Sequence, residues 1–136
     1  MFEYSGDDRA LAMATGTLDA MYRGGLFDHI GGGFCRYSVD ERWLVPHFEK
    51  MLYDNALLIL AYCKAYDITQ NSLYKEIAEK TASYLLTEMM SSEGGFYSAQ
   101  DADSDGEEGK YYAFLPDEMT QLLGEKDGAA FNKHYG

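Results

Sequence analysis

The feature that most limits the fold of this chain is a glycine- and aromatic-rich motif that occurs twice between helical segments. Residues 31–34 are Gly-Gly-Gly-Phe, and residues 94–97 are Gly-Gly-Phe-Tyr. Runs of glycine lose too much backbone entropy to lie inside a helix, so each motif indicates a turn or hairpin. Helix pairs joined by such hairpins are typical of solenoids and closed α/α barrels. The repeat therefore predicts a mainly helical protein with short β-hairpins.

Hydrophobic periodicity predicts where the helices lie. Apolar residues at steps of three and four, with polar caps and breakers, predict helices over residues 7–23, 46–67, 73–90, 116–123 and 129–135. Pro46 suits the first turn of the second helix, where its missing N–H is not needed. The middle of that helix, residues 56–63, is apolar on every face, so we expect other helices to surround it.

Short extended segments are expected between the helices. Alternating side chains and glycines predict a hairpin over residues 34–45, an extended segment over 94–98 and a return strand over 111–114. No linker or low-complexity tract interrupts residues 1–136, which are expected to form a single unit. Because a helical array needs several repeats to enclose a core, we expect this unit to be a piece of a larger array.

Composition limits the classes of function. The 136-residue chain is 46% hydrophobic and carries a net charge of −12, which argues against nucleic acid or an anionic membrane as a partner. No apolar stretch approaches the roughly 20 residues that span a bilayer. Cys35 and Cys63 form no paired motif, so a reducing cytoplasm is the expected location. The sequence contains no nucleotide-binding glycine motif and no zinc-type cluster.

Four side chains are candidates for general acid–base catalysis: His29, His47, Glu49 and Asp54. Removing a proton next to a sugar carbonyl needs a base with a pKa near neutrality, which suits histidine, and a partner on the opposite face. If residues 46–67 are helical, His47 and Asp54 lie two turns apart on one face. The alternative is that His47 and Glu49 satisfy N–H groups at the helix start or pair with arginines, and that His29 packs in its loop.

Four neighbouring side chains, Arg36, Tyr37, Arg42 and Trp43, are candidates for sugar binding. An aromatic ring can stack on a pyranose face, and guanidinium groups can bind hydroxyl or carboxylate groups. The alternative is that Tyr37 and Trp43 pack the hairpin against the rest of the protein while the arginines pair with nearby acids.

The sharpest local motif is the acidic loop of residues 101–106. Asp101, Asp103 and Asp105 match the first ligand positions of a calcium-binding EF-hand loop. The twelfth position should be a bidentate Glu but is Tyr112, so we expect at most a shallow Ca²⁺ site and no other cofactor. The alternatives are a solvated acidic turn, or a loop in which Asp101 or Asp103 faces substrate.

Long stretches of the chain resemble a known family. They read Gly-Leu-Phe-Asp-His-Ile-Gly-Gly-Gly-Phe at residues 25–34, Val-Pro-His-Phe-Glu-Lys-Met-Leu-Tyr-Asp-Asn at 45–55 and Ser-Ala-Gln-Asp-Ala-Asp-Ser-Asp-Gly-Glu-Glu-Gly-Lys-Tyr-Tyr at 98–112. These stretches are similar to the YyaL/spermatogenesis-associated protein 20 family of thioredoxin-domain-containing proteins. The family usually has His where this chain has Cys35, and more often Glu where it has Asp105.

The resemblance implies a fold. Members of the family carry a thioredoxin-like domain, absent here, followed by an α/α barrel of six helical hairpins. That barrel is similar to those of N-acylglucosamine 2-epimerases and six-hairpin glycosidases. The expected fold is therefore all-α with short β-hairpins, a partial (α/α)6 barrel of the six-hairpin glycosidase-like kind. The chain would be the N-terminal part of such a barrel.

The resemblance also implies a function, because the barrel relatives act on sugars. We expect the parent protein to carry out epimerase-, isomerase- or glycosidase-like acid–base chemistry, and the isolated chain to be inactive because most of the barrel wall would be missing. The expected partners are a small sugar-like ligand and either the rest of the barrel or a second copy. The alternative is a non-catalytic module of a thioredoxin-linked protein that binds a ligand or a protein.

Overall fold

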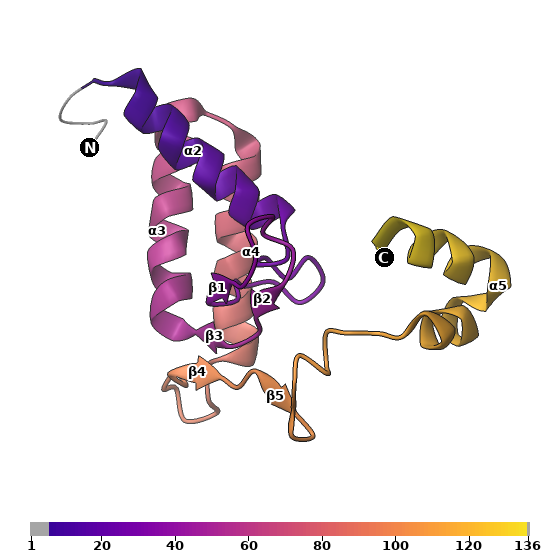
Figure 1. Ribbon diagram of the computed structural model, residues 1–136. Coiled ribbons are helices and arrows are strands. Elements are labelled where there is room, and N and C mark those ends of the chain that lie inside the picture. The colour runs from indigo at the N-terminus through magenta and orange to yellow at the C-terminus, as the bar shows by residue number, and fades with distance from the viewer. Residues whose placement is uncertain (1–5, 136) are drawn as a thin grey trace. The chain divides into compact units, whose positions relative to one another are not determined.

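The computed structural model describes residues 6–135 and is mainly helical, with short antiparallel strand pairs (Figure 1). The helices are α2 (Asp8–Arg23), α3 (Leu52–Thr69), α4 (Ser72–Glu88) and α5 (Pro116–Tyr135). This architecture confirms the expected fold class of helices joined by short hairpins. None of the helices within the described residues is long and apolar enough to cross a membrane.

The chain divides into two compact units, one ending at Ala102 and the other beginning at Asp103. The first unit contains α2, α3 and α4, and the second contains α5. That residues 1–136 belong to one barrel domain stays a prediction.

Two of the predicted helices begin where their polar caps place them. Asp7 caps α2, and its side chain accepts a hydrogen bond from the backbone N–H of Arg9 at 2.9 Å. Asn71 caps α4 in the same way through the N–H of Leu73 at 3.1 Å. Such caps satisfy N–H groups that have no partner inside the helix. The helices predicted over residues 7–23 and 73–90 are therefore confirmed to within two residues.

The prediction that a helix begins at Pro46 is wrong. Strand β1 (Tyr37–Ser38) pairs with β2 (Pro46–His47), and β3 (Lys50–Met51) pairs with β4 (Ala99–Gln100). Residues 46–51 are thus held extended by strands from elsewhere in the chain, and α3 begins only at Leu52. Proline is compatible with an edge strand because its missing N–H need not join the ladder.

Both glycine-aromatic motifs end in an antiparallel bridge. Phe34 bridges to Phe27, and Phe96 bridges to Met90. The hairpin predicted over residues 34–45 is therefore displaced along the chain, because Phe34 pairs backward and the β1–β2 hairpin has its tip at residues 39–45. The two motifs therefore share a local structure, an antiparallel bridge at the phenylalanine, as well as a sequence pattern.

The core of the first unit lies among α2, α3 and α4. The rings of Phe34 and Tyr62 stack with their centroids 5.4 Å apart. The hydroxyl of Tyr62 donates to the carbonyl of Leu18 at 2.7 Å, which ties α3 to α2. The opposite side of α3 is open within this unit, since Leu57 and Leu60 are 63% and 65% exposed. Within this unit, other helices therefore cover only one side of the middle of α3, and the expectation that they surround it holds for that side alone.

The second unit begins with a tight hairpin. Strand β5 (Asp103–Ser104) pairs with β6 (Glu107–Glu108) across Asp105 and Gly106. Both turn residues have positive φ, 52° and 79°, as the favoured two-residue hairpin turn requires. The return strand predicted over residues 111–114 is absent from the described structure, where these residues form a turn and a non-regular stretch. Helix α5 is kinked at Gly124, which matches the prediction of two short helices there.

Candidate functional site

Four of the candidate residues lie together where the strands meet the start of α3. The guanidinium of Arg36 donates to the carboxylate of Glu49 at 2.9 Å, and Nε2 of His47 lies 3.7 Å from the same carboxylate oxygen. The ring of Tyr37 stacks on His47 with the centroids 5.0 Å apart. We call these residues, together with Asp54, the strand–helix cluster.

Strand pairing creates this cluster. The β1–β2 register sets Tyr37 opposite His47, so their side chains stand on the same face of the hairpin. Next to this pair, the backbone N–H of Arg36 donates to the carbonyl of Glu49 at 2.9 Å. The helical spacing expected between His47 and Asp54 is therefore wrong, because His47 lies on a strand and Asp54 on a helix.

Asp54 lies in the first turn of α3, and one of its carboxylate oxygens is shielded from solvent without a hydrogen-bond partner in the described structure. Burial raises the pKa of this carboxyl, and the negative charge of Glu49 acts in the same direction, while Arg36 opposes them. A carboxyl with a raised pKa can hold and release a proton closer to neutral pH. The cluster therefore combines an imidazole, an ion-paired carboxylate and a carboxyl suited to proton transfer.

The ring of His29 contacts aromatic residues that do not belong to the strand–helix cluster. It lies in the glycine loop, with its ring centroid 5.0 Å from that of Tyr22 and 5.3 Å from that of Phe27. Its carbonyl accepts a hydrogen bond from the ammonium of Lys80. These contacts fit the alternative interpretation, in which His29 packs in its loop.

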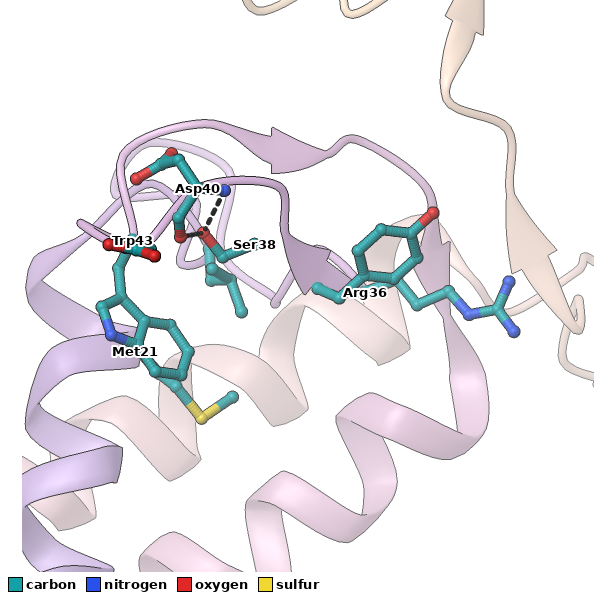
Figure 2. A pocket seen from close by; sticks show the side chains of 8 residues that line it. Met21, Arg36, Ser38, Asp40 and Trp43 are labelled. Carbon is teal, nitrogen blue, oxygen red and sulfur yellow. Dashed lines mark hydrogen bonds between the residues drawn. The ribbon is translucent and has the colours of Figure 1, made fainter.

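Three of the four residues predicted to bind sugar, Arg36, Tyr37 and Trp43, line one depression. An open depression of about 510 Å³ lies beside the hairpin tip and is lined by Met21, Leu26, Arg36, Tyr37, Ser38, Asp40, Glu41 and Trp43. Figure 2 shows Trp43 and Met21 together at this depression, with the guanidinium of Arg36 directed away from both. Arg42 is exposed at the hairpin tip and is not among the lining residues.

Most of the acidic loop forms the β5–β6 hairpin at the start of the second unit. Asp103 lies on β5, and Asp105 occupies the turn, where it pairs with Lys110 at 3.4 Å. Asp101 belongs to the first unit. Among the described residues there is no group of three or more His, Cys, Asp or Glu placed to hold a metal ion. Calcium binding by this loop stays a prediction.

Sequence reasoning missed the buried polar residues that support the site. Asn55 is fully buried; its side chain accepts from the N–H of Phe34 at 2.7 Å and donates to the carbonyls of Phe34 and Met51 at 3.0 and 2.9 Å. Asp28 accepts from the backbone of Ile30 and Gly31 and from Lys50. An Asp shortly before a glycine run is a turn signal that points to Asp28. No local signal identifies Asn55.

Cys35 is buried beside these residues. Burial raises the pKa of its thiol to about 11, although the positive charge of Lys50 partly opposes this. Since the thiolate is the reactive form of cysteine, Cys35 is not poised as a nucleophile or as an acid–base group.

Comparison with solved structures defines the class of the fold. The chain is similar to a crystal structure of D-mannose isomerase with a TM-score of 0.66 and 20% sequence identity, over 79% of this chain and 29% of that one. The similarity shows that this is an α/α-barrel type of fold, as found in a sugar isomerase. No family model matches the sequence.

Comparison with curated proteins defines the family. Spermatogenesis-associated protein 20 of Homo sapiens is 43% identical over 94% of this chain, and the Rattus norvegicus protein is equally similar. An uncharacterized protein of Caenorhabditis elegans is 39% identical over 86% of the chain. The chain belongs to the spermatogenesis-associated protein 20 family, and it spans 18% of the length of the mammalian relatives.

Proposed function

We propose that this chain is part of a larger α/α-barrel protein that performs acid–base chemistry on a sugar, of the isomerase or epimerase type or of the glycosidase type. The observation that carries the proposal is the strand–helix cluster, in which His47 and Asp54 both lie near the ion-paired Glu49 on a fold shared with a sugar isomerase. A thioredoxin-like domain in the whole protein and a cytoplasmic location stay predictions.

The residues of the cluster have different chemical roles in this proposal. His47 takes the proton from the sugar carbon next to the carbonyl, since a neutral imidazole has the basicity that this step needs. Asp54 supplies a proton to the carbonyl oxygen as the enediol forms, because burial raises the pKa of its carboxyl and makes proton uptake easier than for an exposed aspartate. Arg36 holds Glu49, and Glu49 lies close enough to His47 to orient its ring and stabilise the imidazolium.

The reaction is balanced without a redox cofactor. The proton removed from one carbon returns to the neighbouring carbon in an isomerisation, or to the opposite face of the same carbon in an epimerisation. Asp54 regains its proton from the enediol hydroxyl that becomes the carbonyl of the product. The second outcome needs a proton donor on the other side of the sugar. Cys35 is poorly suited to be that donor, because burial raises the pKa of its thiol to about 11 and makes it a weaker acid than an exposed thiol.

The test is turnover of a panel of aldoses by the full-length protein, comparing wild type with His47→Ala. Loss of a positioned acid–base group lowers kcat by about 10²–10⁴-fold, which is the expected result. The matched control is His134→Ala, because His134 lies on the exposed face of α5 in the second unit. Equal turnover by wild type and His47→Ala would exclude the proposed role of His47.

The same panel separates catalysis from simple binding. If the full-length protein binds a sugar and releases it unchanged, the non-catalytic binding module is the better description. The open depression at the hairpin tip favours that second possibility, since it offers an aromatic surface and its lining residues do not include His47, Glu49 or Asp54.

A further inference from the structure

We propose that the depression beside Trp43 is a separate binding subsite for one ring of a neutral saccharide. This inference rests on the proposed function, in that both assume a sugar ligand, but it concerns residues that take no part in the proton transfers. The subsite would hold a part of the ligand that does not react.

The first argument is the backbone of Trp43. Its φ of 62° lies in the left-handed region, where a bulky aromatic residue is a genuine outlier. Such a conformation costs energy and persists only where the surrounding structure imposes it. Residues in such conformations are common at ligand-binding and active sites. The indole packs partly against the core of the first unit and also lines the depression, so this outlier conformation holds the ring at the depression.

The surrounding structure does impose this conformation. The carboxylate of Asp40 accepts hydrogen bonds from the backbone N–H groups of Arg42, Leu44 and Val45, which lie on both sides of Trp43. The N–H of Gly25 donates to the carbonyl of Trp43 at 2.6 Å.

A side chain at position 25 would prevent this approach. A Cβ on Gly25 would lie 2.0 Å from the carbonyl oxygen of Leu44. The glycine pair that ends α2 therefore lets the backbone of the hairpin tip come close, and this contact helps to set the orientation of the indole of Trp43.

The second argument is the chemistry of the lining. The indole of Trp43 and the side chains of Met21 and Leu26 supply apolar surface, and Ser38 and Glu41 supply polar groups beside it. A pyranose ring has the matching pattern, with C–H groups on its faces and hydroxyls at its edge. Flat aromatic surface next to hydrogen-bonding groups suits such an amphipathic ring.

The third argument is charge. Arg36, Asp40 and Glu41 all line the depression, but the guanidinium of Arg36 points away from Trp43 (Figure 2) and pairs with Glu49. The whole chain carries a net charge of −12. An anionic sugar would be repelled by these carboxylates, so the ligand should be neutral.

The test uses the fluorescence of Trp43, the single tryptophan of the chain. The chain is titrated with D-mannose, with the neutral disaccharide cellobiose and with the anion D-glucuronate. We expect a saturable change in emission with at least one neutral sugar, and at least fivefold weaker binding of glucuronate. No saturable change with any of the sugars up to 100 mM, about 100 times a millimolar Kd, would overturn the proposal.

Two variants make the test specific. Trp43→Ala should weaken binding about tenfold, measured by saturation-transfer NMR on the sugar protons, because the stacking surface is lost. Near-UV circular dichroism of the tyrosines shows whether this variant is folded. Glu41→Gln keeps the shape of the side chain and should bring glucuronate closer to the neutral sugars. Unchanged discrimination against glucuronate in Glu41→Gln would contradict the charge argument.

The subsite and the catalytic proposal can fail independently. His47→Ala should leave the Trp43 titration unchanged while abolishing turnover by the full-length protein. Turnover that depends on His47 without any saturable Trp43 signal would overturn the subsite alone. A Trp43 signal with no turnover of any sugar would overturn the catalytic proposal alone.

Discussion

The ammonium of Lys50 lies 2.9 Å from the carboxylate of Asp28 in the interior of the first unit, and Lys50 is only 1% exposed. Lys50 also donates to the carbonyl of Gly32 at 2.9 Å and lies 4.5 Å from the ring centroid of Tyr84. Burial alone would raise the pKa of Asp28, but hydrogen bonds from Lys50 and from the backbone of Gly31 outweigh it and lower the pKa. This pair joins strand β3 to the glycine loop.

Asp28→Asn should destabilise the first unit by about 3 kcal/mol, because it leaves a buried ammonium without its counter-charge. The measurement is the free energy of unfolding in urea. The double variant Asp28→Asn/Lys50→Met is the control, and it should be more stable than Asp28→Asn alone because no buried charge remains. A double variant less stable than the single one would contradict this account.

The same pair predicts an acid dependence of stability. Because the pKa of Asp28 is lowered from its ordinary value of 3.8, the folded protein releases this proton at a lower pH than the unfolded chain does. The stabilisation that the ionised Asp28 contributes is complete at pH values above 3.8 and is lost as the pH falls below 3.8. The stability difference between wild type and Asp28→Asn should therefore shrink as the pH is lowered from 5 towards 2 (about three units).

Asn55→Asp should cost about 2–4 kcal/mol, although the two side chains have the same shape. The carboxylate can still accept from the N–H of Phe34, but it cannot donate to the carbonyls of Phe34 and Met51. The matched control is Asn71→Asp at the exposed cap of α4, which only accepts from Leu73 and should change the stability by less than about 0.5 kcal/mol. Urea unfolding of both variants makes the comparison; equal losses would exclude a special role for Asn55.

The two cysteines should differ sharply in reactivity. Cys63 is exposed on α3, whereas Cys35 is buried and has a pKa of about 11. At pH 8 a thiol reagent should modify one thiol per chain quickly, and the second at least about a hundredfold more slowly. Cys63→Ser should remove the fast phase, and unfolding in urea should release both thiols. Fast modification of Cys63→Ser would show that Cys35 is accessible.

The thiol of Cys35 also links stability to alkaline pH. Its pKa is raised from 9.0 to about 11, so the folded protein keeps the proton over a range in which the unfolded chain loses it. This contribution is complete below pH 9 and is lost as the pH rises to 11, which thermal melts of wild type and Cys35→Ser can measure. A stability gap that does not change over this range would contradict the assignment.

Asp54→Asn should raise stability at neutral pH, by less than about 1 kcal/mol, while lowering any turnover. Burial raises the pKa of Asp54 above 3.8, so its charge is less favourable in the folded state than in the unfolded chain. In thermal melts, the Tm of Asp54→Asn should exceed that of wild type by an amount that grows as the pH rises from 3 to 8 (about five units). The control Asp8→Asn, at the exposed start of α2, should lose a little stability instead, because its charge favours the helix N-terminus.

The positions of α2 and α4 could be predicted because their signals are local. Apolar spacing and the caps Asp7 and Asn71 act within one or two turns, and no distant segment competes with them. The glycine motifs ending at Phe34 and Phe96 were likewise predictable, because a run of glycine cannot be helix interior and no distant contact alters that.

The candidate site was predicted as a list of residues but not as an arrangement. His47, Glu49 and Asp54 were expected to share a helix, and what joins them is a strand pairing and the guanidinium of Arg36. Trp43 was grouped with Arg36 because the two are close in sequence, yet Figure 2 shows the Arg36 guanidinium directed away from it. Arg36 precedes β1 and Trp43 lies in the hairpin tip, so both line one depression although the guanidinium and the indole do not come together.

The sequence by itself determined the helical class, the caps and the places where the chain must turn. Only the tertiary structure decided that residues 46–51 are extended, because β1 and β4 satisfy their backbone groups and outweigh the local preference of Pro46 for a helix start. It also decided that Lys50 is buried and that Asn55 bridges two loops. A side chain that looks solvated or ordinary in sequence is placed in the core by partners many residues away, and local patterns carry no information about those partners.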